Sequence, residues 1–183
     1  KKGEVRAAVD RLVLEAIEKQ KLKAIIARSP DFFSVVKANS ILMTLVYDNL
    51  LKGKIAQWLC DAHKIHSFGY APDLAAGTAI LGNTPDAYDQ IWNLPTDPEK
   101  ITGAGWIKLF AGEMHTSDQY QILPNWLIKT LGLFIPIMKE ILEMNYQYDR
   151  DYFFDSSKFH KRFNYTPTRN AEAVKKTVAR LRQ

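Results

Sequence analysis

Short apolar runs alternate with longer amphipathic segments along the chain. The runs at 22–27, 90–94 and 120–123 are bounded by polar residues and have the length of buried strands. Apolar positions that recur every three or four residues predict helices over 4–20, 39–52, 73–82, 102–115 and 124–145, with two more after Asp155 and Asn170. Strands that alternate with helices predict an α/β fold with parallel pairing.

Polar residues and glycines mark the ends of the predicted helices. A side-chain oxygen at a helix start accepts hydrogen bonds from free N–H groups, and a glycine readily ends a helix. The expected N-terminal caps are Asn39 or Ser40, Asp73, Thr84, Thr102, Asp155 and Asn170. Gly53 is expected to end the helix over 39–52, and Pro136 to kink the one over 124–145. Residues 29–31 are expected to form a loop, and 54–70 and 146–154 to be extended.

The composition limits the compartment in which the chain is expected. A single cysteine, Cys60, excludes an internal disulfide and fits a reducing, cytoplasmic location. The N-terminus is charged and carries no apolar leader. The most apolar stretch, 126–138, contains Lys129 and Pro136 and is too short to span a bilayer, so no membrane contact is expected.

The formal net charge is +5, and part of the excess lies near the C-terminus. The basic residues there are Lys158, Lys161, Arg162, Arg169, Lys175, Lys176, Arg180 and Arg182. They are scattered around helical turns and do not gather on one face with partners that contact bases. This distribution favours a solvated surface over a nucleic-acid site.

No segment has the glycine spacing of a phosphate-binding loop. A dinucleotide fingerprint needs a third glycine where Lys108 follows Gly103 and Gly105. Gly82 is followed by Asn83 and Thr84, which excludes a P-loop there. We therefore expect the phosphates of any nucleotide cofactor to be bound outside this chain.

Two clusters of polar residues suggest other chemistry. Cys60, His63 and His66 lie three apart, but a fourth ligand is far away in sequence, so no metal site is predicted. The aromatic segment 146–154 contains Arg150, which suits an anionic substrate in a cleft. An aromatic edge strand with local ion pairs explains the same segment equally well.

Four stretches, in order, resemble the second half of the extended short-chain dehydrogenase/reductases, the NAD-dependent epimerase/dehydratase family. Lys1-Lys2-Gly3-Glu4 resembles the end of the Tyr-x-x-x-Lys motif, and residues 28–34 (RSPDFFS) the loop usually written Arg-x-x-Asn-x-Tyr-Gly. Residues 66–75 (HSFGYAPDLA) resemble Arg-x-Phe-x-Tyr-Val-x-Asp-Val-Ala. Residues 155–159 (DSSKF), with 166–168 (TPT) and the last helix, resemble the C-terminal signature.

The resemblance implies an α/β fold that combines the C-terminal part of a Rossmann-like parallel sheet with a small α/β substrate-binding domain. Residues 1–34 and about 84–100 would contribute to the sheet, and about 35–83 and 101–183 mostly to the substrate domain. The N-terminal dinucleotide-binding half is expected to be absent. Lys1 lacks a preceding initiator Met, which fits a chain that begins inside a longer protein.

The resemblance also implies roles for individual residues. Lys1, with Lys2 as second choice, matches the catalytic lysine whose charge lowers the pKa of a tyrosine four residues upstream. Ser29 and Pro30 would approach the nicotinamide of NAD or NADP, which the missing half would mainly bind. Asp73 would cap its helix and brace the loops around the site. The predicted substrate-binding residues are Asp31, Phe33, Asn39, Trp58, His66, Phe68 and, from the aromatic segment, Arg150.

The predicted function is that of an NAD(P)-dependent epimerase, dehydratase or reductase that acts on a hydroxyl or carbonyl of a sugar-like or other small substrate. Asp31 stands where the family has Asn, and 33–39 lacks its Gly-Pro-Gly. His66 replaces an arginine that grips a diphosphate, and a histidine does so less well. A nucleotide-sugar substrate is therefore disfavoured. The fragment alone is expected to be inactive, and a homodimer is left open.

Two alternatives remain at this point. The substitutions at Asp31 and His66 also fit a relative that binds nucleotide without chemistry, as a sensor or scaffold. The third interpretation is a complete small protein, in which the strand over 22–27 would expose an apolar edge unless the chain oligomerises.

Overall fold

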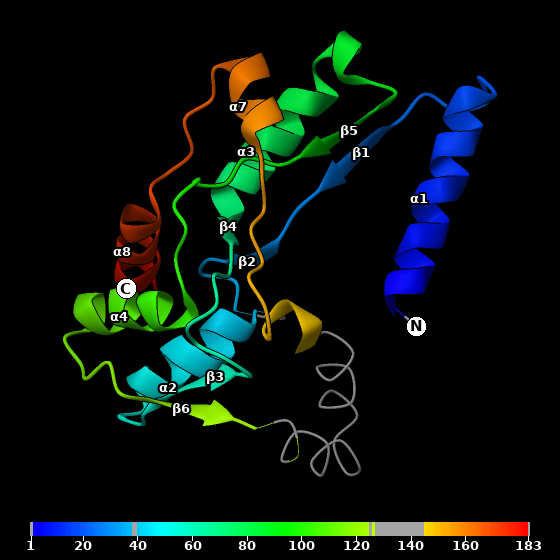
Figure 1. Cartoon of the computed structure of the whole chain (residues 1–183). Helices are drawn as coiled ribbons and strands as arrows, with labels where there is room; N and C mark the ends of the chain where they lie inside the picture. The colour runs from blue at the N-terminus through cyan, green and yellow to red at the C-terminus, as the bar shows by residue number, and fades with distance from the viewer. Residues whose placement is uncertain (1, 38–39, 125, 127–144, 183) are drawn as a thin grey trace.

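Three pairs of short parallel strands form the frame of the molecule (Figure 1). The computed structural model describes residues 2–37, 40–124, 126 and 145–182. The strand pairs are β1 (Ile25–Arg28) with β5 (Gln90–Asn93), β2 (Asp31–Phe33) with β4 (Phe68–Tyr70), and β3 (Ala56–Leu59) with β6 (Tyr120–Leu123). Parallel pairs linked through helices confirm the predicted α/β class. The apolar runs at 22–27, 90–94 and 120–123 are indeed β1, β5 and β6, but β2 begins inside the expected loop.

The helices connect and cover these strands. They are α1 (Lys2–Glu18), the π-helix η1 (Leu42–Tyr47) continuing into α2 (Asp48–Leu51), α3 (Ala71–Gly82), the 3₁₀-helix η2 (Pro85–Ala87), α4 (Gly103–Met114), the 3₁₀-helix η3 (Asn145–Gln147), α7 (Ser157–Phe163) and α8 (Asn170–Leu181). The predicted 124–145 helix falls almost wholly outside the described residues. In the part of the chain that is described, no helix has the length and apolar character needed to cross a membrane.

Several helix ends follow the predicted chemistry. The Thr102 hydroxyl accepts the Gly105 N–H at 3.1 Å at the start of α4. Ser40 Oγ accepts the Met43 N–H at 3.4 Å ahead of η1. Gly53 ends the following helix with a φ of 66°, in the left-handed region that glycine adopts without strain. Local signals were sufficient at these ends because the partner lies within one turn.

Two predicted caps are wrong. Asp73 lies inside the first turn of α3, after the N-cap residue Tyr70 and Pro72. Its buried carboxylate instead accepts hydrogen bonds from the segment 165–168. Asn170 is the first residue of α8, and its own N–H donates to Asp97 Oδ2 at 2.8 Å. Asp73 and Asp97 both accept hydrogen bonds from segments that are far away in sequence. Tertiary packing determines these partners, and the local sequence does not show them.

Two hydrophobic cores stabilise the fold. The larger one, between β3, η1, α4 and α8, contains Phe33, Tyr47, Trp58, Trp106 and Phe110, each at most 1% exposed. The smaller one contains Leu74, Leu81, Trp92 and Phe159, and so joins α3 and α7 to β5. The sequence assigned α3 and α7 to the substrate domain, whereas their packing groups them with the β1–β5 sheet. The division of the chain into domains stays a prediction.

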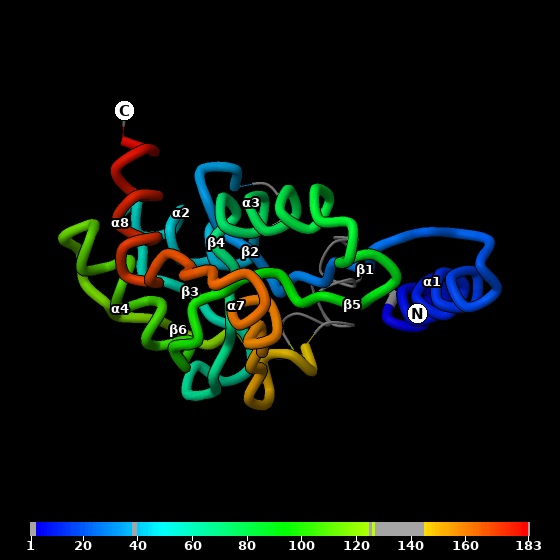
Figure 2. The backbone as a smooth tube through the Cα atoms, turned by 90° about the horizontal axis from the view of Figure 1, so that it is seen from above, coloured from blue at the N-terminus to red at the C-terminus, as the bar shows by residue number. Residues whose placement is uncertain are grey.

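Helix α1 lies at one end of the molecule, beyond β1 and β5 (Figures 1 and 2). It joins the rest through an ion pair between Asp10 and Arg28, at the end of β1. Its residues Val5, Val9 and Leu12, which are 63%, 53% and 67% exposed, form an apolar stripe that is open to solvent. The described part of the chain therefore offers this stripe no covering partner.

We expect Gly103→Ala to destabilise the chain by about 1–3 kcal/mol, the cost typical of overpacking a core. A Cβ at Gly103 would lie 2.3 Å from Trp58 Cε2, and that indole is buried among other rings. The matched control is Gly112→Ala on the same helix, where a Cβ meets nothing within 4 Å. That change should be neutral or stabilise by about 0.5–1 kcal/mol, because alanine favours helix over glycine. Urea unfolding of both variants tests this, and equal effects would contradict the packing described.

Candidate functional site

The candidate site is centred on Asp31, the first residue of β2. Parallel pairing sets Asp31 beside Phe68 of β4, which brings His66, two residues earlier, next to the carboxylate. Alternation along β2 directs Asp31 and Phe33 to the core side, while Phe32 is 39% exposed. The short strand pair therefore places an acid next to an imidazole 35 residues away in sequence.

The segment carrying His66 is held firmly by its backbone. Its N–H donates to Ile101 O at 2.9 Å, and its carbonyl accepts the indole N–H of Trp106 at 2.8 Å. On either side, Ile65 and Ser67 exchange backbone hydrogen bonds with Tyr152. The imidazole position is therefore fixed by α4 and by the segment after η3.

Asp31, His66 and Tyr148 form one hydrogen-bonded group. Asp31 Oδ2 lies 3.2 Å from His66 Nε2 and accepts the Tyr148 hydroxyl at 2.9 Å. His66 Nδ1 lies 3.1 Å from the Gln147 carbonyl. A carbonyl and a carboxylate only accept, so each ring nitrogen of His66 faces an acceptor. Tyr148 also stacks on the imidazole, with ring centroids 4.3 Å apart.

Burial and charge act on this group in opposite directions. Burial raises the pKa of Asp31, but the hydrogen bond and charge of His66 outweigh it, and with smaller contributions from Tyr148 and Arg6 they hold that pKa below its usual value. Burial first, and the Asp31 charge second, raise the pKa of Tyr148 well above that of a free phenol. The same causes raise the pKa of Tyr152 to about 12. The resting state is thus a carboxylate with neutral phenols around it.

Exposure separates the predicted substrate residues into two groups. Phe33, Trp58 and Phe68 are at most 2% exposed and pack behind His66, with Trp58 and Phe68 centroids 6.2 and 4.6 Å from the imidazole. The His66 side chain is also 2% exposed, whereas that of Asp31 is 35% exposed. The aromatic residues thus support the group in this conformation, and Asp31 presents it to solvent. Their roles toward a substrate stay predictions.

The other predicted site residues are not part of the Asp31 group or fall outside the described residues. Ser29 is exposed and Pro30 buried, at the carboxyl end of β1. Arg150 is not drawn into the group: its exposed side chain pairs with its neighbour Asp149 at 2.6 Å. Lys1 and Asn39 lie outside the described residues. Tyr148 belongs to the aromatic segment 146–154. No local pattern identified its hydrogen bond, because its partner Asp31 is 117 residues away.

The residues that suggested metal do not assemble a site. Among the described residues, no group of three or more His, Cys, Asp or Glu side chains is placed to hold an ion. Cys60 Sγ lies 3.8 Å from the Asn145 carbonyl, and burial, with the nearby Asp149 and Asp61 charges, raises the pKa of its thiol. His66 is committed to Asp31. Cys60 and His66 of that run are thus engaged by other partners.

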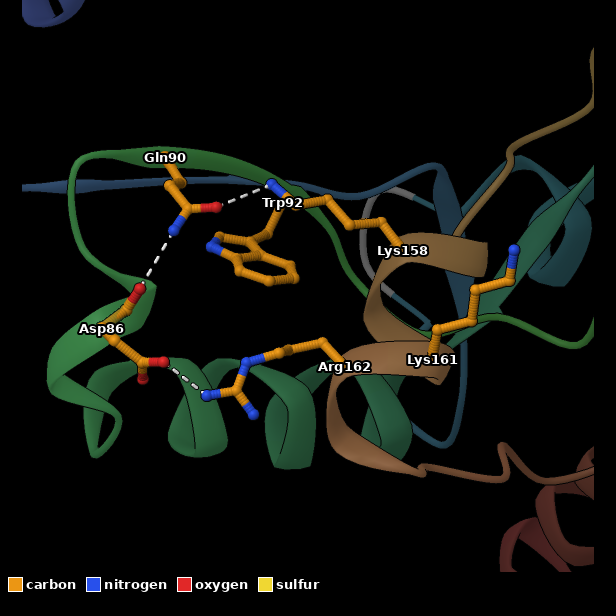
Figure 3. A pocket seen from close by; sticks show the side chains of 6 residues that line it. All are labelled: Asp86, Gln90, Trp92, Lys158, Lys161 and Arg162. Carbon is orange, nitrogen blue, oxygen red and sulfur yellow. Dashed lines mark hydrogen bonds and ion pairs between the residues drawn. The ribbon is translucent and has the colours of Figure 1, made fainter.

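A separate cleft of about 440 Å³ lies between η2, β5 and α7 (Figure 3). It is lined by Asp86, Gln90, Trp92, Lys158, Lys161 and Arg162. Lys158 binds Gln90 Oε1 at 3.0 Å and lies over the Trp92 ring, Arg162 pairs with Asp86 at 2.5 Å, and Lys161 points away from the indole. With its two inward cations already bound, this cleft is the weaker candidate.

No protein-family model and no curated protein matches the sequence. Solved structures do share the fold. UDP-glucose 4-epimerase from Thermus thermophilus, in complex with NAD, matches with a TM-score of 0.73 and 14% identity over 96% of this chain. dTDP-glucose 4,6-dehydratase from Bacillus anthracis, in complex with NAD, matches with a TM-score of 0.70 and 13% identity over 94%. This chain covers 52% and 49% of those two chains, about half of their length. At such identities the likeness establishes a Rossmann-like epimerase/dehydratase fold and nothing finer.

We expect Tyr148→Phe to destabilise the chain at neutral pH by about 1–3 kcal/mol, because a buried hydrogen bond to a charged group is lost. Since the folded-state pKa of Asp31 is lowered, its stabilising effect is present above the unfolded value and is lost as pH falls through the folded value. The penalty should therefore shrink as the pH is lowered below 3.8, the ordinary pKa of an aspartate.

The matched control is Tyr152→Phe, whose ring lies 5.1 Å from that of His66 but whose hydroxyl makes no hydrogen bond in the described contacts. It should cost less than about 0.5 kcal/mol. Urea unfolding of both variants across this pH range is the measurement. A pH-independent Tyr148→Phe penalty, or an equal one for Tyr152→Phe, would contradict the proposed hydrogen-bonded group.

Proposed function

We propose that this chain is the substrate-facing part of an NAD(P)-dependent enzyme that acts on a hydroxyl or carbonyl of a small molecule, as an epimerase, dehydratase or reductase. The observation that supports this proposal is the extent of the fold match. Between 94% and 97% of the chain aligns with about half the length of two dehydratases and one epimerase in complexes with NAD, at TM-scores of 0.70–0.73. The activity of the longer protein is an inference from fold, supported by the chemistry of the site below.

The position of the site supports this proposal. In parallel α/β sheets, ligands bind at the carboxyl ends of strands, and Ser29, Pro30 and Asp31 directly follow the carboxyl end of β1. Ser29 is exposed there and suits the nicotinamide side of a cofactor. NAD(P), when bound, supplies the hydride acceptor or donor. The described residues show no cradle for its phosphates, so we assign these to a complementary half.

Helix α1 points its first turns at the same place. Arg6 lies close enough to Asp31 to lower the pKa of that carboxyl, which makes the start of α1 a neighbour of the site. Lys1, or Lys2, would then hold the ribose and lower the pKa of an upstream tyrosine by its positive charge. The tyrosine would exchange the proton of the reacting hydroxyl or carbonyl.

The unpaired surfaces of this end suit a complementary half. Among the described residues β1 is paired only on its β5 side, so one strand edge is open. Helix α1, which carries the exposed apolar stripe, lies on the far side of β1 from the strand pairs β2–β4 and β3–β6 (Figure 1). A nucleotide-binding half that continued the parallel sheet would cover both. A cytoplasmic location, a small-molecule partner and a homodimer remain predictions alongside this proposal.

The second candidate is a sensor or scaffold that binds nucleotide without chemistry. The observation that favours it is the mutual pairing of Asp31 with His66 and Tyr148, since side chains bound to one another are less available to a substrate. The residue four positions before Lys1 discriminates between the two: a tyrosine favours the enzyme and any other residue favours the scaffold or a changed mechanism.

We expect the protein that includes the region upstream of Lys1 to bind NAD(H) or NADP(H) at or below millimolar concentration. Isothermal titration of both dinucleotides tests this. If neither dinucleotide binds at millimolar concentration, the proposed enzymatic function is refuted. In the binding protein, Lys1→Met should lower turnover by about 10²-fold or more, the usual contribution of a positioned acid–base group. Turnover that is lost on Tyr→Phe, four residues before Lys1, would exclude the scaffold.

A further inference from the structure

The polar groups of the candidate site form hydrogen bonds with one another, so few hydrogen-bonding atoms are left for a ligand. Both His66 nitrogens and the Tyr148 hydroxyl already have acceptors. The carboxylate of Asp31 receives both of its bonds on Oδ2, and its side chain is 35% exposed. What the group offers to a ligand is therefore an acceptor with negative charge, and no free donor.

Two arginines near the site are compensated in the same way. Arg28 pairs with Asp10, and Arg150 pairs with Asp149. The charge of Arg6 contributes least among the causes that lower the pKa of Asp31, and no ion pair joins these two side chains in the described contacts. Arg28 and Arg150 are thus committed to carboxylates, so neither of these two guanidinium forks is left to bind a diphosphate, the group for which their geometry is best suited.

We propose that this site takes an uncharged or cationic small molecule that donates hydrogen bonds, such as a polyol or amino sugar, and excludes nucleoside diphosphates. The inference rests on the proposed function and deepens it by naming the substrate class. A hydroxyl or ammonium donates to the open side of Asp31. A diphosphate there would meet an ionised carboxylate, and the nearby guanidinium groups of Arg28 and Arg150 are already paired.

The test compares three ligands on the protein that includes the upstream region. Saturation-transfer NMR and isothermal titration are run with glucosamine, glucose 6-phosphate and UDP, and NAD(H) is titrated separately. Glucosamine should bind at least tenfold more tightly than UDP or glucose 6-phosphate. Equal or weaker binding of glucosamine overturns the inference. Failure of NAD(H) to bind is a different result, which refutes the proposed function itself.

Asp31→Asn tests the assigned cause, because it removes the charge and changes the shape of the side chain little. It should lower the affinity for glucosamine about tenfold and raise that for UDP. The matched control is Asp86→Asn, which removes an equivalent carboxylate paired with Arg162 in the separate cleft and should change neither affinity. Asp31→Asn with unaltered ligand preference overturns the inference. If that variant does not fold, the three-ligand comparison on the unmodified protein decides alone.

Discussion

The carboxylate of Asp31 is the interaction on which the candidate site depends. It joins three segments that are far apart in sequence: the start of β2, the turn before β4 that carries His66, and η3 with Tyr148. A buried imidazole N–H without an acceptor would be costly, and so would a buried phenol without one. One acceptor oxygen satisfies both, so the three segments hold their positions together and the aromatic rings pack against a fixed imidazole.

Two further buried aspartates do the same for the C-terminal segment. Asp73 accepts bonds from the Tyr165 hydroxyl and from Thr168, and Asp97 accepts the first N–H of α8. Each carboxylate accepts a hydrogen bond from a backbone N–H group that would otherwise lack a partner. These long-range polar contacts thus position the segment between α7 and α8 and the first residue of α8.

Sequence patterns sufficed where the deciding contact is local. The strand runs that became β1, β5 and β6, and the Thr102 cap of α4, have their determinants within a few residues. They failed where one residue type serves two purposes. A polar side chain near a helix start looks like a cap, yet Asp73 binds a segment about 95 residues away. The resemblance assigned Phe33 and Trp58 to the substrate, and no local pattern shows that long-range packing also buries both in the core.

The two departures from the family pattern are physically one change. A neutral asparagine at position 31 would remove the charge that His66 contacts, and the imidazole at position 66 stacks on Tyr148 with the rings inclined by 17°. Asp31 and His66 thus form a matched pair. Such a pair preserves the backbone arrangement of β2 and β4, because it supplies the same segments with a satisfied contact. It alters only what the site presents, a carboxylate in place of a cation, so a retained fold and a changed ligand preference are compatible.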